Sequence, residues 1–245
     1  MNGEENNPSL APRRATASLN FCQISRKIAL DATGMYVDGF TTRVLPVFDH
    51  IDDEATAAAN KAWDSAMSSP AHHENFDPGD FAEAAQGYGL EVYENLQFSR
   101  QQLLNLAAAG LYHLWERLLK QFICKELRAW TFNGHSIQKI IAPADFRRLE
   151  EFLSEFGFHL AQQNYYADLS ELRLVANVAK HGDGKSCEEL QASAPHLFGG
   201  YNYQFDIFST ADSLELKPED FTRYAKTVTD FWDTFPENLT FVNAD

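Results

Sequence analysis

Apolar side chains recur at intervals of three and four residues through 99–129, and this is the strongest helical pattern in the chain. The stripe consists of Leu103, Leu104, Ala107, Leu111, Leu114, Trp115, Leu118 and Phe122. Such spacing puts the side chains on one face of a helix, which must be buried against other elements. Ser99 and Gln102 match a capping box, so we expect this helix to begin at residue 99. Residues 107–110 are narrow enough for a second helix to approach closely.

Weaker signals of the same kind follow along the chain. We expect helices at 51–67, 80–95, 143–161, 167–181 and 218–235, and another that begins at residue 186. Pro143 and Pro218 stand at first-turn positions, and Ser186 precedes Glu189 in a capping arrangement. Residues 68–80 are rich in turn formers and predict a loop, and residues 133–136 interrupt the helical pattern.

Three short stretches have strand-like composition. Residues 35–40 and 41–48 predict two strands or extended segments around Gly39 and Pro46, and residues 201–208 alternate apolar and polar side chains. The predicted fold class is therefore mainly α, a helical bundle with small β or irregular additions.

Length and composition favour one sizeable core. The chain has 245 residues, is 44% hydrophobic and holds 19 Phe, 9 Tyr and 4 Trp. Residues 1–20 are polar and lack an apolar leader segment, so we expect a disordered tail followed by a single helical domain at 21–245. Without an apolar run of about 18 residues, no membrane span is expected. The cysteines, Cys22, Cys124 and Cys187, are odd in number and far apart, which is typical of free thiols in the cytoplasm.

The formal net charge of -15 restricts the function. A strong nonspecific grip on a phosphate backbone needs a surplus of Lys and Arg, so this class of nucleic-acid binding is disfavoured. A small cationic cleft for RNA stays open, as does a basic protein partner. Dinucleotide-binding, Walker and nucleophile-elbow motifs are absent from the sequence.

A regular polar stripe runs along the predicted helix 167–181. Arg173, Asn177 and His181 follow one another at four-residue intervals, which stacks them on one helix face, and Lys180 lies beside them. Apolar residues flank the stripe on both sides, so we expect the stripe to face a crevice or a subunit interface. Gly182 can adopt the left-handed conformation that ends a helix. The alternative interpretation is an ordinary solvated stripe with a basic last turn.

Residues 176–182, ANVAKHG, resemble the final-helix motif of the HEPN superfamily, the all-α fold of many prokaryotic toxins and defence ribonucleases. In that motif an Arg, usually followed by a polar residue, precedes a His by a few positions. Asn177 and His181 match the polar residue and the His, whereas Ala176 stands at the Arg position. The likeness is to bacterial members with a degenerate Arg-x4-6-His motif and covers about 100–185, within a HEPN-like core at about 80–235.

The resemblance implies metal-independent RNA cleavage in a cleft that two copies of the chain form together. His181 would then transfer a proton at a ribose 2′-OH, Arg173 or Lys180 would stabilise charge on the phosphate, and Asn177 would position the substrate. A homodimer with an RNA substrate is thus expected, in antiviral defence or a toxin–antitoxin-like system, without cofactor or metal. The alternative function is a helical protein-interaction module that does not catalyse a reaction.

Other chemistry has weaker support in the sequence. His72 and His73 form a conceivable metal site in the 68–80 loop, but adjacent loop histidines are more often solvent-exposed. His113 and Glu116 reverse the Glu-x-x-His order of di-iron bundles, and Glu116 is better placed to pair with Lys120. Cys187 lies near a helix start, where a thiolate nucleophile is conceivable, although a lone thiol is more often inert.

Overall fold

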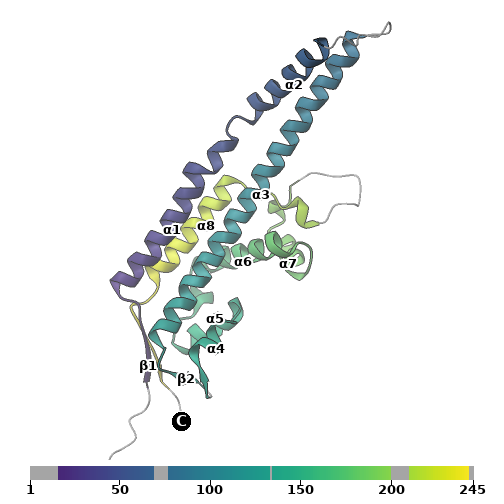
Figure 1. Ribbon diagram of the computed structural model, residues 1–245. Coiled ribbons are helices and arrows are strands. Elements are labelled where there is room, and N and C mark those ends of the chain that lie inside the picture. The colour runs from purple at the N-terminus through teal and green to yellow at the C-terminus, as the bar shows by residue number, and fades with distance from the viewer. Residues whose placement is uncertain (1–15, 69–76, 133, 200–209, 243–245) are drawn as a thin grey trace, which may run out of the picture. The chain divides into compact units, whose positions relative to one another are not determined.

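The computed structural model describes residues 16–68, 77–132, 134–199 and 210–242 (Figure 1). Within these residues the fold is mainly helical with two small two-stranded sheets, which confirms the predicted fold class. The chain divides into two compact units. Among the described residues, the first unit comprises 16–30, 115–166 and 230–242, and the second comprises 31–114 and 167–229. The prediction of one domain over 21–245 stays a prediction.

The first unit contains both sheets. Strand β1 (Thr16–Asn20) pairs antiparallel with β4 (Asn238–Val242), and β2 (Thr131–Phe132) pairs with β3 (His135–Ser136). Helices α4 (Ile137–Ile141) and α5 (Phe146–Glu155) follow the second sheet. The sequence predicts a disordered tail over residues 1–20, whereas residues 16–20 form β1 and pair with β4.

Aromatic side chains fill the core of the first unit. The Phe21 ring centroid lies 5.0 Å from that of Phe122 and 5.7 Å from that of Trp232. Each such ring pair contributes about 0.5–1.5 kcal/mol beyond the burial of its area. The Arg26 guanidinium donates hydrogen bonds to the carbonyl oxygens of Trp232, Asp233 and Phe235, which satisfies the last turn of α8 (Pro218–Thr234).

The second unit is built from helices. It holds α2 (Ile51–Met67), α6 (Tyr166–His181) from residue 167 onward, α7 (Lys185–Ser193), and parts of α1 (Gln23–Arg43), α3 (Pro78–Glu126) and α8. Two glycines of α3 allow close helix contacts. A Cβ at Gly89 would lie 2.8 Å from the Ala59 Cβ of α2, and one at Gly110 would overlap the Tyr36 hydroxyl of α1. That hydroxyl donates to the Ala107 carbonyl over 2.8 Å.

Three predicted helices are confirmed with nearly the expected bounds. They are α2 against 51–67, α6 against 167–181 and α8 against 218–235. The apolar face of α8 is buried as its spacing predicts, except at Ala225, which is half-buried. The buried residues of that face are Phe221, Tyr224, Val228, Phe231, Trp232 and Phe235.

The prediction of strands or extended segments at 35–40 and 41–48 is wrong. Helix α1 covers Gln23–Arg43, and a short 3-10 helix covers Leu45–Phe48. Ala29, Thr33 and Phe40 are buried at helical spacing, so tertiary packing outweighs the strand propensity of the β-branched residues nearby.

Three predicted helix boundaries are also wrong. Helix α3 is continuous from Pro78 to Glu126, and Ser99 donates to the Asn95 carbonyl inside it instead of capping a new helix. Helix α5 spans only Phe146–Glu155, because the Asp145 side chain caps its start and Gly157 has a φ of 83° just beyond its end. Helix α7 begins at Lys185, with Gly184 rather than Ser186 at the N-cap. The strand predicted at 201–208 lies outside the described residues.

Candidate functional site

Helix α6 carries the four residues that the sequence singles out. Its apolar side chains are buried on both sides of the polar stripe, as the spacing predicts. Arg173 and Asn177 are half-buried, whereas Lys180 and His181 are exposed in the last turn. The four side chains therefore divide into an inner pair and an outer pair.

Helix α7 contacts the inner pair, Arg173 and Asn177. The Asn177 amide Nδ2 donates to the Ser186 Oγ over 3.2 Å, and the Arg173 Nη2 lies 3.9 Å from the Glu189 Oε2. Ser186 and Glu189 both belong to α7. The sequence predicts that the polar stripe faces a crevice or a subunit interface. At Arg173 and Asn177 the stripe faces α7 of the same chain, and these two side chains connect α6 to α7.

A tight turn joins the two helices and positions α7. Gly182 has a φ of 72°, and its amide donates to the Val178 carbonyl over 2.9 Å, which ends α6 in the left-handed conformation as predicted. The Asp183 carboxylate accepts a hydrogen bond of 2.7 Å from the Ala211 amide. The turn is therefore tied to a segment 28 residues further along the chain.

Ala176, where the resemblance to HEPN proteins predicts an Arg, lies in the core. Ala176 is fully buried, so an arginine there would have to place its charge among apolar side chains. Arg173, one turn earlier, has a carboxylate neighbour in Glu189. In the outer pair, neither His181 nor Lys180 forms an ion pair within the part of the chain that the structure describes.

The structure also places two of the remaining sequence candidates, Cys187 and Glu116. Burial raises the pKa of the Cys187 thiol, and the negative charge of Asp183 raises it further, so the thiol is a poor nucleophile. Glu116 pairs with Lys120 at 3.1 Å, as the sequence predicts. His72 and His73 lie outside the described residues. Among the residues placed by the structure, no group of three or more His, Cys, Asp or Glu side chains could hold a metal ion.

A charged network in the second unit was missed by sequence reasoning. The Arg223 guanidinium of α8 donates to Asp168 and, over 2.6 Å, to Glu171, both on α6. The Tyr224 hydroxyl donates to the same Glu171 oxygen over 2.7 Å. Burial lowers the pKa of Arg223, but the hydrogen bonds and charge of Glu171, together with Asp168, outweigh this effect and raise it above its ordinary value. The three-residue spacing of Asp168 and Glu171 indicated a shared helix face but not the partner on α8.

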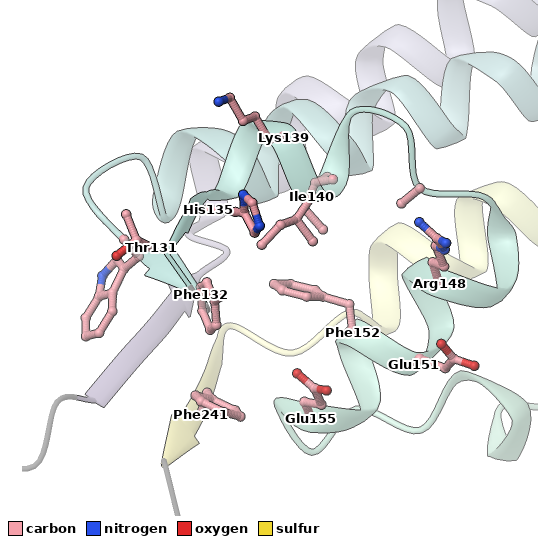
Figure 2. Close-up of a pocket in the computed structure, with 13 residues that line it drawn as sticks. Thr131, Phe132, His135, Lys139, Ile140, Arg148, Glu151, Phe152, Glu155 and Phe241 are labelled. Atoms are coloured by element: carbon pink, nitrogen blue, oxygen red, sulfur yellow. The ribbon is translucent and has the colours of Figure 1, made fainter.

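A pocket of about 770 Å³ opens in the first unit (Figure 2). Its apolar lining includes the rings of Trp130, Phe132, Phe152 and Phe241 and the side chains of Ile140, Ile141 and Ala144. The Phe132 centroid lies 5.8 Å from that of Phe241 and 6.2 Å from that of Phe152. No sequence pattern marked these residues, because the pairing of β1 with β4 brings Phe241 to side chains more than 80 positions earlier.

Charged side chains line the same pocket. His135, Lys139 and Arg148 are exposed cations or potential cations, and Glu151 and Glu155 are carboxylates. Arg147, outside the pocket, donates to the Glu151 Oε1 over 2.8 Å and compensates its charge. Arg148 and Glu155 form no ion pair with another described residue. The pocket therefore combines an apolar floor with one cation and one carboxylate that lack an ion-pair partner among the residues that the structure places.

Comparisons with protein families, with curated proteins and with solved structures gave no match for this chain. In the described residues, no helix combines the length and the apolar character that crossing a membrane requires.

Proposed function

We propose that this protein is a helical protein-interaction module that binds a basic, amphipathic partner and does not act through catalysis. The observation that carries the proposal is the concentration of exposed large apolar side chains in one segment. Among the described residues, nine of the eleven lie between residues 31 and 106. These nine are Met35, Val44, Val47, Phe81, Tyr88, Leu90, Phe98, Leu103 and Leu106. A concentration of exposed large apolar side chains is typical of surfaces that bind other proteins.

Small side chains make the contact between α2 and α3, the helix that carries six of these nine residues. Gly89 lies directly against Ala59, and Ile51 and Ala55 are the buried residues of α2. Because small side chains make this contact, the helices approach closely without enclosing the larger apolar groups. Tyr88 and Leu106 are 18 residues apart on α3, which is about five whole turns, so they share one side of the helix. A third helix could cover that side.

The charge of the same segment indicates what kind of partner fits. Residues 31–68 and 77–106 hold twelve Asp and Glu against three Lys and Arg, namely Arg43, Lys61 and Arg100. A second copy of this surface would bring like charges together, which is unfavourable. A partner with apolar residues on one helix face and Lys or Arg beside them would satisfy both properties.

A titration with two model peptides tests the proposal. One peptide presents Leu at helical spacing with Lys on the polar face, and its counterpart carries Glu at the Lys positions. We expect the Lys peptide to bind in the micromolar range with an affinity that falls as salt rises, and the Glu peptide to bind much more weakly. The double variant Tyr88→Ser/Leu106→Ser should weaken binding of the Lys peptide by about tenfold.

The matched control is Ile24→Ser/Ile28→Ser, which removes two exposed apolar side chains from the other unit. Equal affinity for both peptides, or equal weakening by both double variants, would show that this surface has no specific role and would overturn the proposal.

A second candidate function is metal-independent RNA cleavage by a HEPN-like homodimer, in defence or as a toxin. It is favoured by one observation, the exposure of both His181 and Lys180 at the end of α6. His181 would take the proton of a ribose 2′-OH, and Lys180 would stabilise the phosphate, since Arg173 is paired with Glu189.

An RNA cleavage assay in the presence of EDTA, together with the mass of the protein in solution, tests this candidate. Cleavage by a dimer that falls by about 100-fold in His181→Ala and also falls in Lys180→Gln would support it. A monomer without cleavage, or cleavage that His181→Ala leaves unchanged, would exclude it.

A further inference from the structure

We infer that the pocket of the first unit is a binding site for a small organic anion with a planar apolar body. The site is independent of the partner surface and of the α6 residues. Its volume of about 770 Å³ falls within the range of about 300–1,000 Å³ that is typical of small-molecule sites. The ligand class follows from the lining residues.

Aromatic rings provide the apolar part of the site. Figure 2 shows Phe132, His135 and Phe152 around the same space, with Ile140 beside them. Phe152 is buried and in edge contact with Phe132, so the floor is fixed by packing. A flat apolar ligand can lie against such rings with favourable dispersion and ring–ring contacts.

Arg148 provides the charge that selects an anion. It lines the pocket on α5, and its guanidinium forms no ion pair with any residue that the structure places. The two carboxylates of the lining, Glu151 and Glu155, differ in how far they can neutralise the charge of Arg148. Glu151 is hydrogen-bonded by Arg147, which leaves Glu155 as the carboxylate without such a partner.

Two other nitrogen-bearing side chains line the pocket. His135 lies in the pocket, whereas the ammonium end of Lys139 points away from it (Figure 2). The lining thus offers Arg148 and His135 to an anion, and only Glu155 opposes them. In a chain with a net charge of -15, a lining whose cations, Lys139 and Arg148, equal its carboxylates, Glu151 and Glu155, in number is less acidic than the chain as a whole, which favours an anionic ligand.

A calorimetric titration of the full chain with four compounds tests the inference. The compounds are 1-naphthoate, 1-naphthyl phosphate, the cation 1-naphthylmethylammonium and acetate. We expect the naphthyl anions to bind at least about tenfold more tightly than the cation, and acetate not to bind measurably. The stronger of the two anions assigns the head group as a carboxylate or a phosphate.

Variants connect the binding to the pocket. Arg148→Gln should weaken 1-naphthoate by about tenfold, because it removes the charged donor. Glu155→Gln should strengthen it by about two- to threefold, because it removes the opposing charge. Arg128→Gln is the matched control, since Arg128 is exposed in the same unit and does not line the pocket. All three residues are exposed, and a thermal melt confirms that each variant is folded.

Three results would overturn the inference. The first is equal affinity for the naphthyl anions and the naphthyl cation, and the second is the absence of binding by any naphthyl compound. The third is an equal effect of Arg148→Gln and Arg128→Gln, which would indicate a general effect of net charge.

Discussion

Arg173 of α6 lies 3.9 Å from Glu189 of α7. A role of Arg173 in binding phosphate would instead require its guanidinium to be free. The contact is an ion pair of two partly exposed side chains, with 26% and 44% of their surfaces accessible, so its contribution to stability is small. The negative charge of Glu189 beside Arg173 opposes the binding of another anion there. If this end of α6 takes part in RNA cleavage, as the second candidate function proposes, Lys180 and His181 are its exposed residues.

The inner and outer residues of α6 should respond differently to truncation. Asn177→Ala removes the hydrogen bond to Ser186 and should lower the free energy of unfolding by about 1 kcal/mol. His181→Ala removes an exposed side chain and should change it by less than about 0.5 kcal/mol. Urea unfolding of both variants checks this difference. A larger loss from His181→Ala than from Asn177→Ala would contradict the division into an inner and an outer pair.

The contact of Gly110 with Tyr36 should make a normally favourable substitution harmful. Gly→Ala inside a helix usually stabilises by about 0.5–1 kcal/mol. Here the new Cβ would overlap the Tyr36 hydroxyl, so Gly110→Ala should destabilise by about 1–3 kcal/mol.

A double-mutant cycle tests the cause of that loss. Tyr36→Phe removes the hydroxyl and its hydrogen bond to the Ala107 carbonyl, at a cost of about 1 kcal/mol. In the Tyr36→Phe background, Gly110→Ala should cost at least about 1 kcal/mol less than in the parent chain. Additive free energies would show that the two residues do not interact as described.

Local signals predicted the elements that have clear ends and a continuous apolar face. Helix α8 is one example, since Pro218 opens it and its stripe is buried except at Ala225. Helix α1 was missed because its buried residues, Ala29, Thr33 and Phe40, are few and separated by glycines and β-branched residues. Whether Ser99 caps a helix or bonds back to Asn95 depends on the packing around it, which the sequence does not encode locally.

The candidate site shows the same limit. The four-residue spacing predicted that Arg173 and Asn177 share a face, and both contact α7. The turn at Gly182 was predicted, but which side chains cover that face also depends on the bond from Ala211 to Asp183, which joins segments 28 residues apart. The pocket in the first unit depends on strand pairing between distant segments, so no local pattern could reveal it.

The cysteines should react at very different rates with iodoacetamide at neutral pH. Cys22 is exposed, and its hydrogen bond with the Ser25 side chain lowers the pKa of its thiol, whereas burial raises the pKa of Cys187. Because the thiolate is the nucleophile, Cys22 should be alkylated at least about tenfold faster than Cys187. Ser25→Ala should slow the reaction at Cys22 alone. Peptide mass spectrometry measures both rates, and similar values would contradict the burial of Cys187.

Stability should fall at alkaline pH, and Tyr224 should account for part of the fall. Burial, followed by the hydrogen bond to Glu171 and its charge, raises the pKa of Tyr224 above the ordinary value of 10.0. Burial also raises the pKa values of Tyr36 and Tyr165. Above pH 10 the unfolded chain releases these protons while the folded chain keeps them, so the free energy of unfolding decreases. Each tyrosine contributes at most about 1.4 kcal/mol per pH unit.

Urea unfolding of the parent chain and of Tyr224→Phe between pH 8 and pH 11 measures the contribution of this residue. At pH 8 the variant should lose about 1 kcal/mol, the value of one hydrogen bond, while Glu171 keeps its bond to Arg223. Above pH 10 the stability of the variant should fall less steeply than that of the parent. Tyr88→Phe is the control, because Tyr88 is exposed, and it should leave the slope unchanged. Parallel curves for the parent and Tyr224→Phe would show that Tyr224 titrates alike in both states, contrary to its burial beside Glu171.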